Sequence, residues 1–129
     1  MRLLFSMLLV GAGGFVGSVL RYALALAAQR YSISFPHGTL WANLLGCLAI
    51  GAISALAAAT EVLSPAVRLL LATGICGGFT TMSSFIYELA QLLRDNELWL
   101  AAGYFGLTLG GCLAMFWIGA LAVKLLLKA

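Results

Sequence analysis

The chain has 129 residues, of which 64% are hydrophobic and only 9% are charged. Because soluble domains carry roughly 25% charged residues, this composition excludes a water-soluble globular protein. The net charge is +3, but the basic residues stand singly, which argues against a nucleic-acid-binding surface. Four uncharged runs, at positions 3–20, 31–60, 69–87 and 98–123, each reach the roughly 18 to 20 residues that a helix needs to cross a lipid bilayer.

We therefore predict an all-α membrane protein with four transmembrane helices, at approximately residues 3–29, 38–60, 67–93 and 98–125, in one domain over residues 1–129. These spans use nearly the whole chain. No extramembrane domain remains to hold an enzyme site, so we expect the protein not to be an enzyme. The cysteines, Cys47, Cys76 and Cys112, lie in apolar runs, where a free thiol behaves as a small hydrophobe. Neither disulfides nor a metal cluster is indicated.

The first span carries glycines at a spacing that suits close helix packing. Gly13 and Gly17 are four residues apart, as are Gly106 and Gly110 in the last span. This pattern predicts a face on which a neighbouring helix approaches closely in lipid. Arg21 also lies inside the first span, and a charge at this depth must be paired or face a wet vestibule.

The second span opens with polar residues. Thr39 and Asn43 lie one turn apart on the same helical face. The Asn43 carboxamide must find hydrogen-bond partners, because unsatisfied it would cost several kcal/mol in hydrocarbon. Two roles remain open for it, a hydrogen bond to another helix or direct contact with a ligand. His37, which follows Pro36 in a loop, supports no metal or catalytic role.

The third span combines glycines with hydroxyl residues at mid-membrane depth, in the stretch Gly74-Ile75-Cys76-Gly77-Gly78-Phe79-Thr80-Thr81-Met82-Ser83-Ser84-Phe85. Glycine destabilises a helix by about 1 kcal/mol relative to alanine, and Ser and Thr side chains compete for backbone hydrogen bonds. We therefore predict a helix broken near residues 77–81. Broken backbone is tolerated in a membrane only where protein or a water-filled cavity surrounds it, and its freed carbonyls suit a cation. The alternative is a glycine-lined packing face whose hydroxyls bond back to the preceding turn.

The fourth span carries a mildly polar stripe. Tyr104, Thr108 and Cys112 recur every four residues and so share one helical face. Glu88, inside the third span, must like Arg21 be paired or face a wet vestibule. Neither feature alone identifies a function.

The basic residues leave the orientation of the chain nearly undetermined. With four spans, both termini lie on one side of the membrane, which collects Arg2, Arg68, Lys124 and Lys128. The other side collects Arg21, Arg30 and Arg94. The Lys and Arg bias of loops normally fixes topology, and a difference of one residue hardly fixes it. This balance predicts insertion in both orientations and an antiparallel homodimer; the alternative is a chain oriented by its partners.

Several of these features occur together: the stretches Gly17–Arg21, Gly38–Asn43 and Gly74–Phe85, and the regular spacing of Tyr104, Thr108 and Cys112. In this combination the chain resembles the bacterial fluoride channel family, Fluc, also called CrcB. The similarity extends over essentially the whole chain. The combination is specific, although no single piece is.

The resemblance implies a dual-topology homodimer with two antiparallel pores and a structural Na⁺ at the dimer centre. By motif match, the backbone carbonyls of Gly77 and Thr80 would hold this ion. Met82 stands where the first of two pore phenylalanines is usual, and Cys112 stands where a serine is common. Arg21 would attract anions into a vestibule. The residues expected along the fluoride pore are Asn43, Phe85, Met82, Thr39, Ser84, Tyr104, Thr108 and Cys112.

The function implied by this resemblance is passive export of fluoride from the cytoplasm across the bacterial plasma (inner) membrane. Fluoride, the lipid bilayer and a second copy of the chain are the expected partners, and Na⁺ is a cofactor that is not transported. One alternative is a small dual-topology, proton-coupled exporter of cationic compounds, a class that needs a glutamate in its first helix. Residues 3–29 contain no acidic residue, and Glu88 is the only candidate substitute. The other alternative is a non-transporting membrane assembly subunit.

Overall fold

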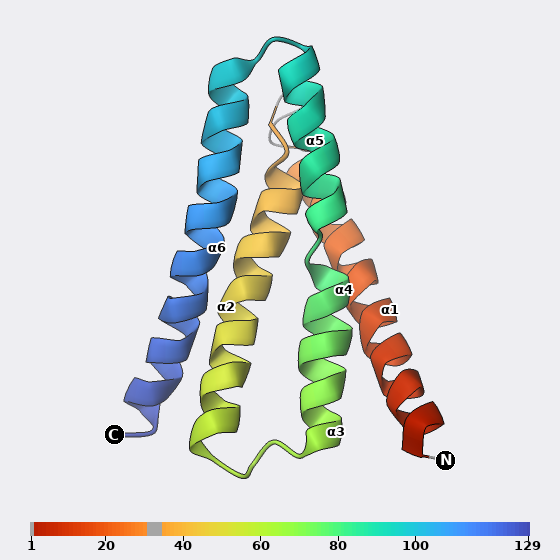
Figure 1. Ribbon diagram of the computed structural model, residues 1–129, viewed down its shortest axis with the longest axis vertical. Helices are drawn as coiled ribbons and strands as arrows, with labels where there is room; N and C mark the ends of the chain where they lie inside the picture. The colour runs from red at the N-terminus through yellow and green to blue at the C-terminus, as the bar shows by residue number, and fades with distance from the viewer. Residues whose placement is uncertain (1, 31–34) are drawn as a thin grey trace.

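The structure is a computed structural model that describes residues 2–30 and 35–129. Its long apolar helices cross the molecule at Leu3–Ala28, His37–Ala59, Pro65–Arg94 and Leu98–Leu126 (Figure 1), and no strand occurs in the described residues. Each is long and apolar enough to span a bilayer. The prediction of an all-α, four-span membrane protein is therefore confirmed. Three spans are continuous helices with bounds close to these: α1 (Arg2–Ala28), α2 (His37–Ala59) and α6 (Leu98–Leu126).

The third span is assembled from several pieces. Ser64 caps its start, because the Ser64 hydroxyl accepts a hydrogen bond from the Val67 amide at 3.3 Å. The short helix α3 (Pro65–Arg68) then widens into a π-helix, η1 (Leu69–Cys76), which is followed by the single α-turn α4 (Gly77–Phe79). Two extended residues separate α4 from the last piece, α5 (Met82–Arg94). The span thus changes from α to π winding and back, and it breaks once.

The break is narrower than the predicted range of 77–81. Gly77 and Gly78 remain helical, whereas Thr80 has ψ 154° and Thr81 has φ −151° and ψ 120°. Threonine is β-branched and tolerates extended backbone well. The Thr81 hydroxyl also caps α5 by accepting a hydrogen bond from the Ser84 amide at 3.2 Å. The alternative prediction holds in part too, since the Thr80 hydroxyl bonds back to the Cys76 carbonyl at 2.9 Å.

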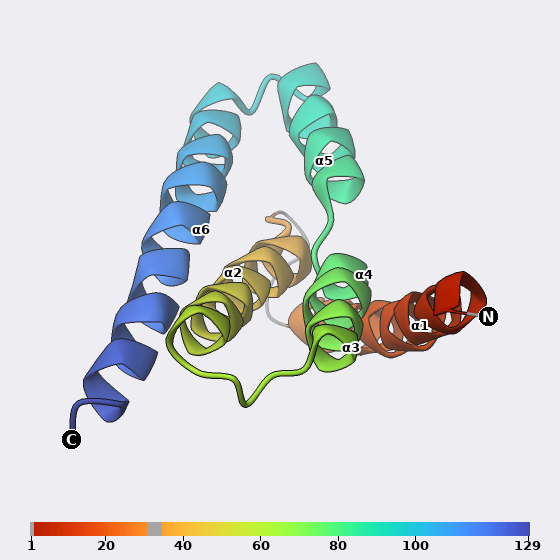
Figure 2. The same ribbon diagram turned by 60° about the horizontal axis from the view of Figure 1, so that its bottom comes forward.

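The glycines of the third span and of α1 are used for packing. A methyl group on Gly13 would lie 2.6 Å from the Leu70 carbonyl oxygen and 2.8 Å from the Gly74 Cα. One on Gly17 would overlap the backbone of Ile75. The predicted close-packing face on α1 is therefore confirmed. At this face α1 crosses the first half of the third span (Figure 2).

The second predicted glycine face is wrong within this chain. A methyl group on Gly106 or Gly110 would have no described neighbour within 4 Å. In α6 the close contacts to α2 come instead from Gly119, whose added methyl would overlap the Leu48 carbonyl. Spacing alone marks a small face but does not say which helix covers it.

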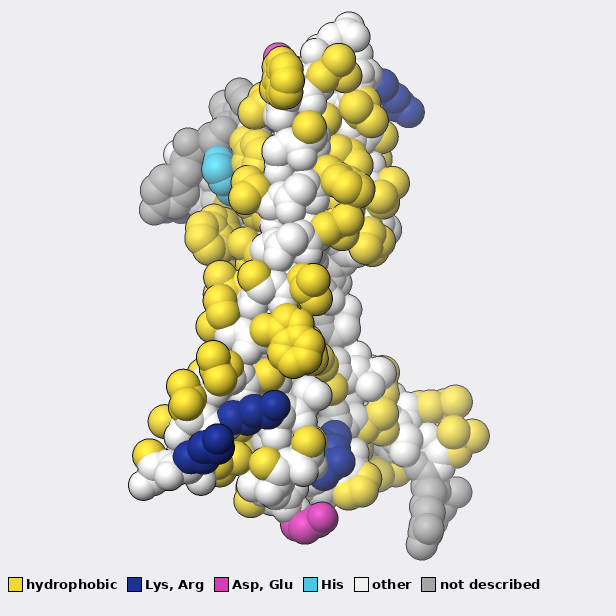
Figure 3. Space-filling view, turned by 60° about the vertical axis from the view of Figure 1, so that its left-hand side comes forward, with side chains coloured by type: hydrophobic (Ala, Val, Ile, Leu, Met, Phe, Trp, Pro, Cys, Tyr) yellow, Lys and Arg dark blue, Asp and Glu magenta, His cyan; other side chains and the backbone are white. Residues whose placement is uncertain are grey.

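The surface of the molecule fits a lipid environment. Apolar side chains cover its middle in Figure 3, while Lys and Arg lie toward its two ends. The most buried large side chains, Phe85 and Tyr104, lie together, with Leu40, Leu92 and Ala101 in the same cluster. The buried core is thus concentrated on the α5 side of the break.

A matched pair of glycines on α1 tests the packing argument. Gly13→Ala should destabilise the protein by roughly 1 to 3 kcal/mol, because the added methyl group meets rigid backbone. Gly11→Ala should be neutral or slightly stabilising, since its methyl meets no described neighbour within 4 Å and alanine favours helix. Thermal unfolding in detergent measures both, and equal melting temperatures for the two variants would contradict the predicted close contact.

Candidate binding site at the helix break

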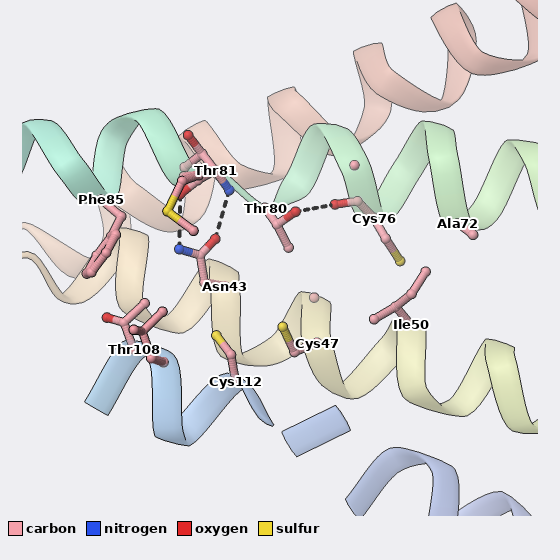
Figure 4. A pocket seen from close by; sticks show the side chains of 14 residues that line it. Asn43, Cys47, Ile50, Ala72, Cys76, Thr80, Thr81, Phe85, Thr108 and Cys112 are labelled. Carbon is pink, nitrogen blue, oxygen red and sulfur yellow. Dashed lines mark hydrogen bonds between the residues drawn. The ribbon is translucent and has the colours of Figure 1, made fainter. Parts of the chain in front are cut away.

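Asn43 of α2 holds the broken backbone of the third span. Its side-chain oxygen accepts a hydrogen bond from the Thr81 amide at 2.7 Å, and its side-chain nitrogen donates to the Thr81 carbonyl at 3.1 Å (Figure 4). Both Thr81 groups lie at the break. A carboxamide has an oxygen acceptor and two N–H donors, so it satisfies both Thr81 groups and carries a second N–H. Of the two roles open for Asn43, the interhelical hydrogen bond is present in the structure.

The end of α4 is capped from α1. The Gly78 carbonyl accepts hydrogen bonds from the Arg21 side chain (Nε) at 3.2 Å and from the Ser18 hydroxyl at 3.4 Å. A cation at a carbonyl end also complements the helix dipole. Arg21 is half-buried, and its predicted need for a partner is met by a carbonyl instead of a carboxylate. Sequence reasoning missed Ser18 as a cap, although Ser18 lies one turn before Arg21.

Two carbonyls at the break lose the partners they would have in a continuous helix. The amide four residues after Gly77 is Thr81, and it bonds Asn43 instead. The amide four residues after Thr80 is Ser84, and it bonds the Thr81 hydroxyl instead. Gly77 and Thr80, the residues predicted as sodium ligands, are thus among the positions from which helical N–H donors are diverted. Carbonyl oxygens are hard ligands that suit such a cation.

A cavity of about 350 Å³ lies against the break, between α2, the third span and α6. It brings together five of the predicted pore residues with both predicted sodium ligands (Figure 4). Thr39, Ser84, Tyr104 and Arg21 are not among the described residues that line it. Met82 is largely exposed, whereas Phe85 is buried against Tyr104, with ring centroids 5.1 Å apart. The predicted residues on its wall are Asn43, Gly77, Thr80, Met82, Phe85, Thr108 and Cys112.

Thr108, one of the residues that line this cavity, carries an unsatisfied hydroxyl. The residue is 3% exposed, and its hydroxyl oxygen has no hydrogen-bond partner within the described part of the chain. A buried polar group without a partner costs about 1 to 3 kcal/mol. Because the residue lines the cavity while its hydroxyl oxygen is closed to it, a rotation of the side chain would be needed for a water molecule or a ligand there to remove this cost. The wall therefore offers a donor that the protein itself does not use.

A second polar cluster surrounds Glu88 of α5. One carboxylate oxygen accepts a hydrogen bond from the Thr39 hydroxyl at 2.7 Å, and the other accepts from the Tyr104 hydroxyl at 2.6 Å. Thr39 and Glu88 lie on the wall of a larger cavity of about 810 Å³, which His37, Asp95 and Glu97 also line. The hydroxyls of Thr39 and Tyr104, two of the residues predicted along the pore, are thus engaged by a carboxylate. The one sequence signal for this cluster was the position of Glu88 inside a span.

The hydrogen bond from Tyr104 to Glu88 should contribute measurably to stability. Tyr104→Phe removes the donor to a half-buried carboxylate, and hydrogen bonds to charged groups contribute about 1.5 to 3 kcal/mol. Tyr87→Phe is the matched control, since the exposed Tyr87 hydroxyl accepts a hydrogen bond only from Gln91 on its own helix among the contacts of the described chain. Thermal unfolding should show a clear loss for the first variant and a change below about 0.5 kcal/mol for the second. Equal effects would mean that the Glu88 contact adds no net stability.

Comparison with known proteins places these features in a family. The sequence model described as "CrcB-like protein, Camphor Resistance (CrcB)" matches residues 8–120 of the chain. The chain is 52% identical over 120 residues to a protein of Chlorobaculum tepidum, covering 93% of this chain and 95% of that one. It is 50% identical over 112 residues to a protein of Chlorobium phaeobacteroides, covering 86% and 88%. A protein of Methylobacillus flagellatus is 38% identical over 128 residues, covering 98% and 100%. All three relatives bear the name "Fluoride-specific ion channel FluC".

Proposed function

The chain belongs to the CrcB-like family, and from this premise we propose that it is a fluoride-specific channel of the bacterial plasma membrane. Fluoride would leave the cytoplasm passively, down its electrochemical gradient, without covalent chemistry. The observation that carries the proposal is the unsatisfied hydroxyl of Thr108, a residue that lines one cavity together with Asn43 and Phe85. Such a wall offers hydrogen-bond donors to an anion in otherwise apolar surroundings.

The donors at the cavity suit a small, strongly hydrated anion. A pore must replace the water that fluoride loses with groups that donate hydrogen bonds. Thr108 supplies a hydroxyl, and Asn43 supplies the N–H beyond the one it donates to Thr81. The positive edge of the Phe85 ring adds a weaker attraction. Met82 offers no such edge, although its polarizable thioether fills a similar volume at the cavity wall.

A central sodium ion fits the backbone at the break. Gly77 and Thr80 contribute carbonyls from which helical donors are diverted, as the bonds of the Thr81 and Ser84 amides indicate. Two carbonyls from one chain are too few for a hard cation, which takes several oxygen ligands. An antiparallel second copy would bring the same two, so the sodium ion and the homodimer belong to one proposal. When bound, the ion would supply a fixed positive charge that lowers the cost of holding an anion nearby.

Arg21 would add a second positive charge near the path. Its side chain donates to the Gly78 carbonyl, which fixes the guanidinium beside the break. A fixed cation draws anions toward a cavity mouth and raises their local concentration. We therefore propose that Arg21 is a vestibule residue that attracts anions. Its hydrogen bond to the Gly78 carbonyl has a structural role in addition.

The alternative functions predict different behaviour. A proton-coupled exporter needs an acidic residue in its first helix, and α1 (Arg2–Ala28) contains none. Glu88 is instead hydrogen-bonded by Thr39 and Tyr104. A structural assembly subunit would purify with other proteins, whereas the proposed channel purifies as a homodimer and transports fluoride alone.

The direct test is fluoride efflux from liposomes that contain the purified protein. Under a potassium and valinomycin voltage clamp, an ion-selective electrode should record rapid loss of fluoride, while chloride is retained. Protein-free liposomes are the control. Retention of both anions, or equal loss of both, would contradict the proposed channel.

Asn43→Asp should abolish fluoride efflux. The carboxylate keeps an acceptor for the Thr81 amide but loses the donor to the Thr81 carbonyl, and its charge repels an anion in the cavity. Asn96→Asp is the matched control, because it adds the same charge at an exposed loop residue whose φ of 58° aspartate also tolerates. Efflux and the gel-filtration profile are measured for both variants. Undiminished flux in the folded Asn43→Asp protein would make Asn43 a packing residue only.

A further inference from the structure

Three thiols from distant parts of the sequence meet at the cavity beside the break. Cys47 comes from α2, Cys76 from η1 and Cys112 from α6, and all three line the same 350 Å³ cavity. None is in a disulfide. Figure 4 shows the sulfur atoms of Cys47 and Cys112 beside each other on one wall, with Cys76 on the facing helix. The described chain thus places three soft ligands at a site where the proposed fluoride path also runs.

Cys47 and Cys112 form the close pair. Both thiols line the cavity from helices that pack directly against each other, α2 and α6. The register of their helices is fixed by backbone contacts, because a methyl group on Gly119 would overlap the Leu48 carbonyl and one on Gly51 would overlap the Phe116 carbonyl. Two sulfur atoms held this way on two packed helices are available together to one bound ion.

The number of ligands decides which metal ions fit. Within residues 2–30 and 35–129, no group of three or more His, Cys, Asp or Glu residues is placed to hold a metal ion together. A four-ligand zinc site is therefore not offered here. Soft ions that prefer thiolates, such as Cu⁺, Ag⁺ and Hg²⁺, bind firmly to two sulfur atoms in a nearly linear arrangement. The pair of Cys47 and Cys112 has the chemistry that this class of ion requires.

We propose that Cys47 and Cys112 form a two-sulfur site for a soft metal ion, and that an ion bound there blocks the cavity to fluoride. With Hg²⁺, two S–H bonds break, two Hg–S bonds form and two protons leave to water, with no change of oxidation state. The blocking part of the proposal rests on the proposed channel function. The binding part rests only on the thiol geometry.

The position of the pair explains why a bound ion would obstruct the path. Cys47 lies one turn after Asn43 on α2, and Cys112 lies one turn after Thr108 on α6. The sulfur bridge would thus lie one turn beyond the two donors proposed for fluoride, across the same cavity. It would also tie α2 to α6, the helices that form this wall.

Mass spectrometry and flux measurements on the full-length protein test the two parts separately. Intact wild-type protein in detergent, treated with one equivalent of Hg²⁺, should gain one mercury atom and lose two protons. Fluoride efflux from liposomes should stop on Hg²⁺ addition and return with dithiothreitol. Each variant is compared with its own untreated rate. Cys76→Ser is the matched control and should behave like the wild type in both measurements.

Removal of either paired thiol should weaken binding sharply. Cys47→Ser and Cys112→Ser should need about 100-fold more Hg²⁺ for the same block, because a second ligand on the same site acts at high effective concentration. Equal sensitivity of all variants, or full mercury occupancy with unchanged efflux, would overturn the proposal. A wild-type protein that binds mercury through two sulfurs but carries no fluoride before treatment would contradict the proposed channel and leave the two-sulfur site supported.

Discussion

The double hydrogen bond between Asn43 and Thr81 is the constraint on which the other features of the site depend. A break in a membrane-spanning helix exposes backbone groups that hydrocarbon cannot satisfy, at a cost of several kcal/mol each. One carboxamide from α2 satisfies the amide and the carbonyl of Thr81 together. Because the Thr81 amide is diverted to Asn43, the Gly77 carbonyl is released from the helical pattern. The start of α5, the polar wall of the cavity and the freed carbonyls all follow from this contact.

The sequence was sufficient to predict the four spans, because a long apolar run in lipid satisfies its own backbone hydrogen bonds as a helix. The sequence located the break in the third span less accurately. Glycine and hydroxyl propensities act locally and indicated residues 77–81, whereas Gly77 and Gly78 stay helical and Gly78 packs closely against the backbone of Gly14 in α1. The same limit applies to Gly106 and Gly110, whose spacing suggested a contact that this chain does not make. Patterns within one helix do not identify the neighbour that uses them.

The two charges inside the spans show the same limit for polar contacts. Burial in lipid predicts that Arg21 and Glu88 find partners, and the natural expectation is a residue of opposite charge. Arg21 instead donates to the Gly78 carbonyl, and Glu88 accepts from the hydroxyls of Thr39 and Tyr104. The partners come from helices remote in sequence, so no local spacing reveals them. Thr39 and Tyr104 were predicted as pore residues, and in the structure the hydroxyls of both donate to the Glu88 carboxylate.

The π-helical winding of Leu69–Cys76 has a consequence for how the third span tolerates changes in length. A π-turn holds an extra residue compared with an α-turn, so such segments often record the insertion of one residue into an α-helix. Deleting a residue there would let the segment rewind as an α-helix while the direction of Cys76 and Thr80 toward the cavity is largely kept. The helix α5 has no extra residue of this kind. A deletion at its start would turn both Phe85 and Glu88 away from Tyr104. The two halves of one membrane span therefore differ in how readily evolution can lengthen or shorten them.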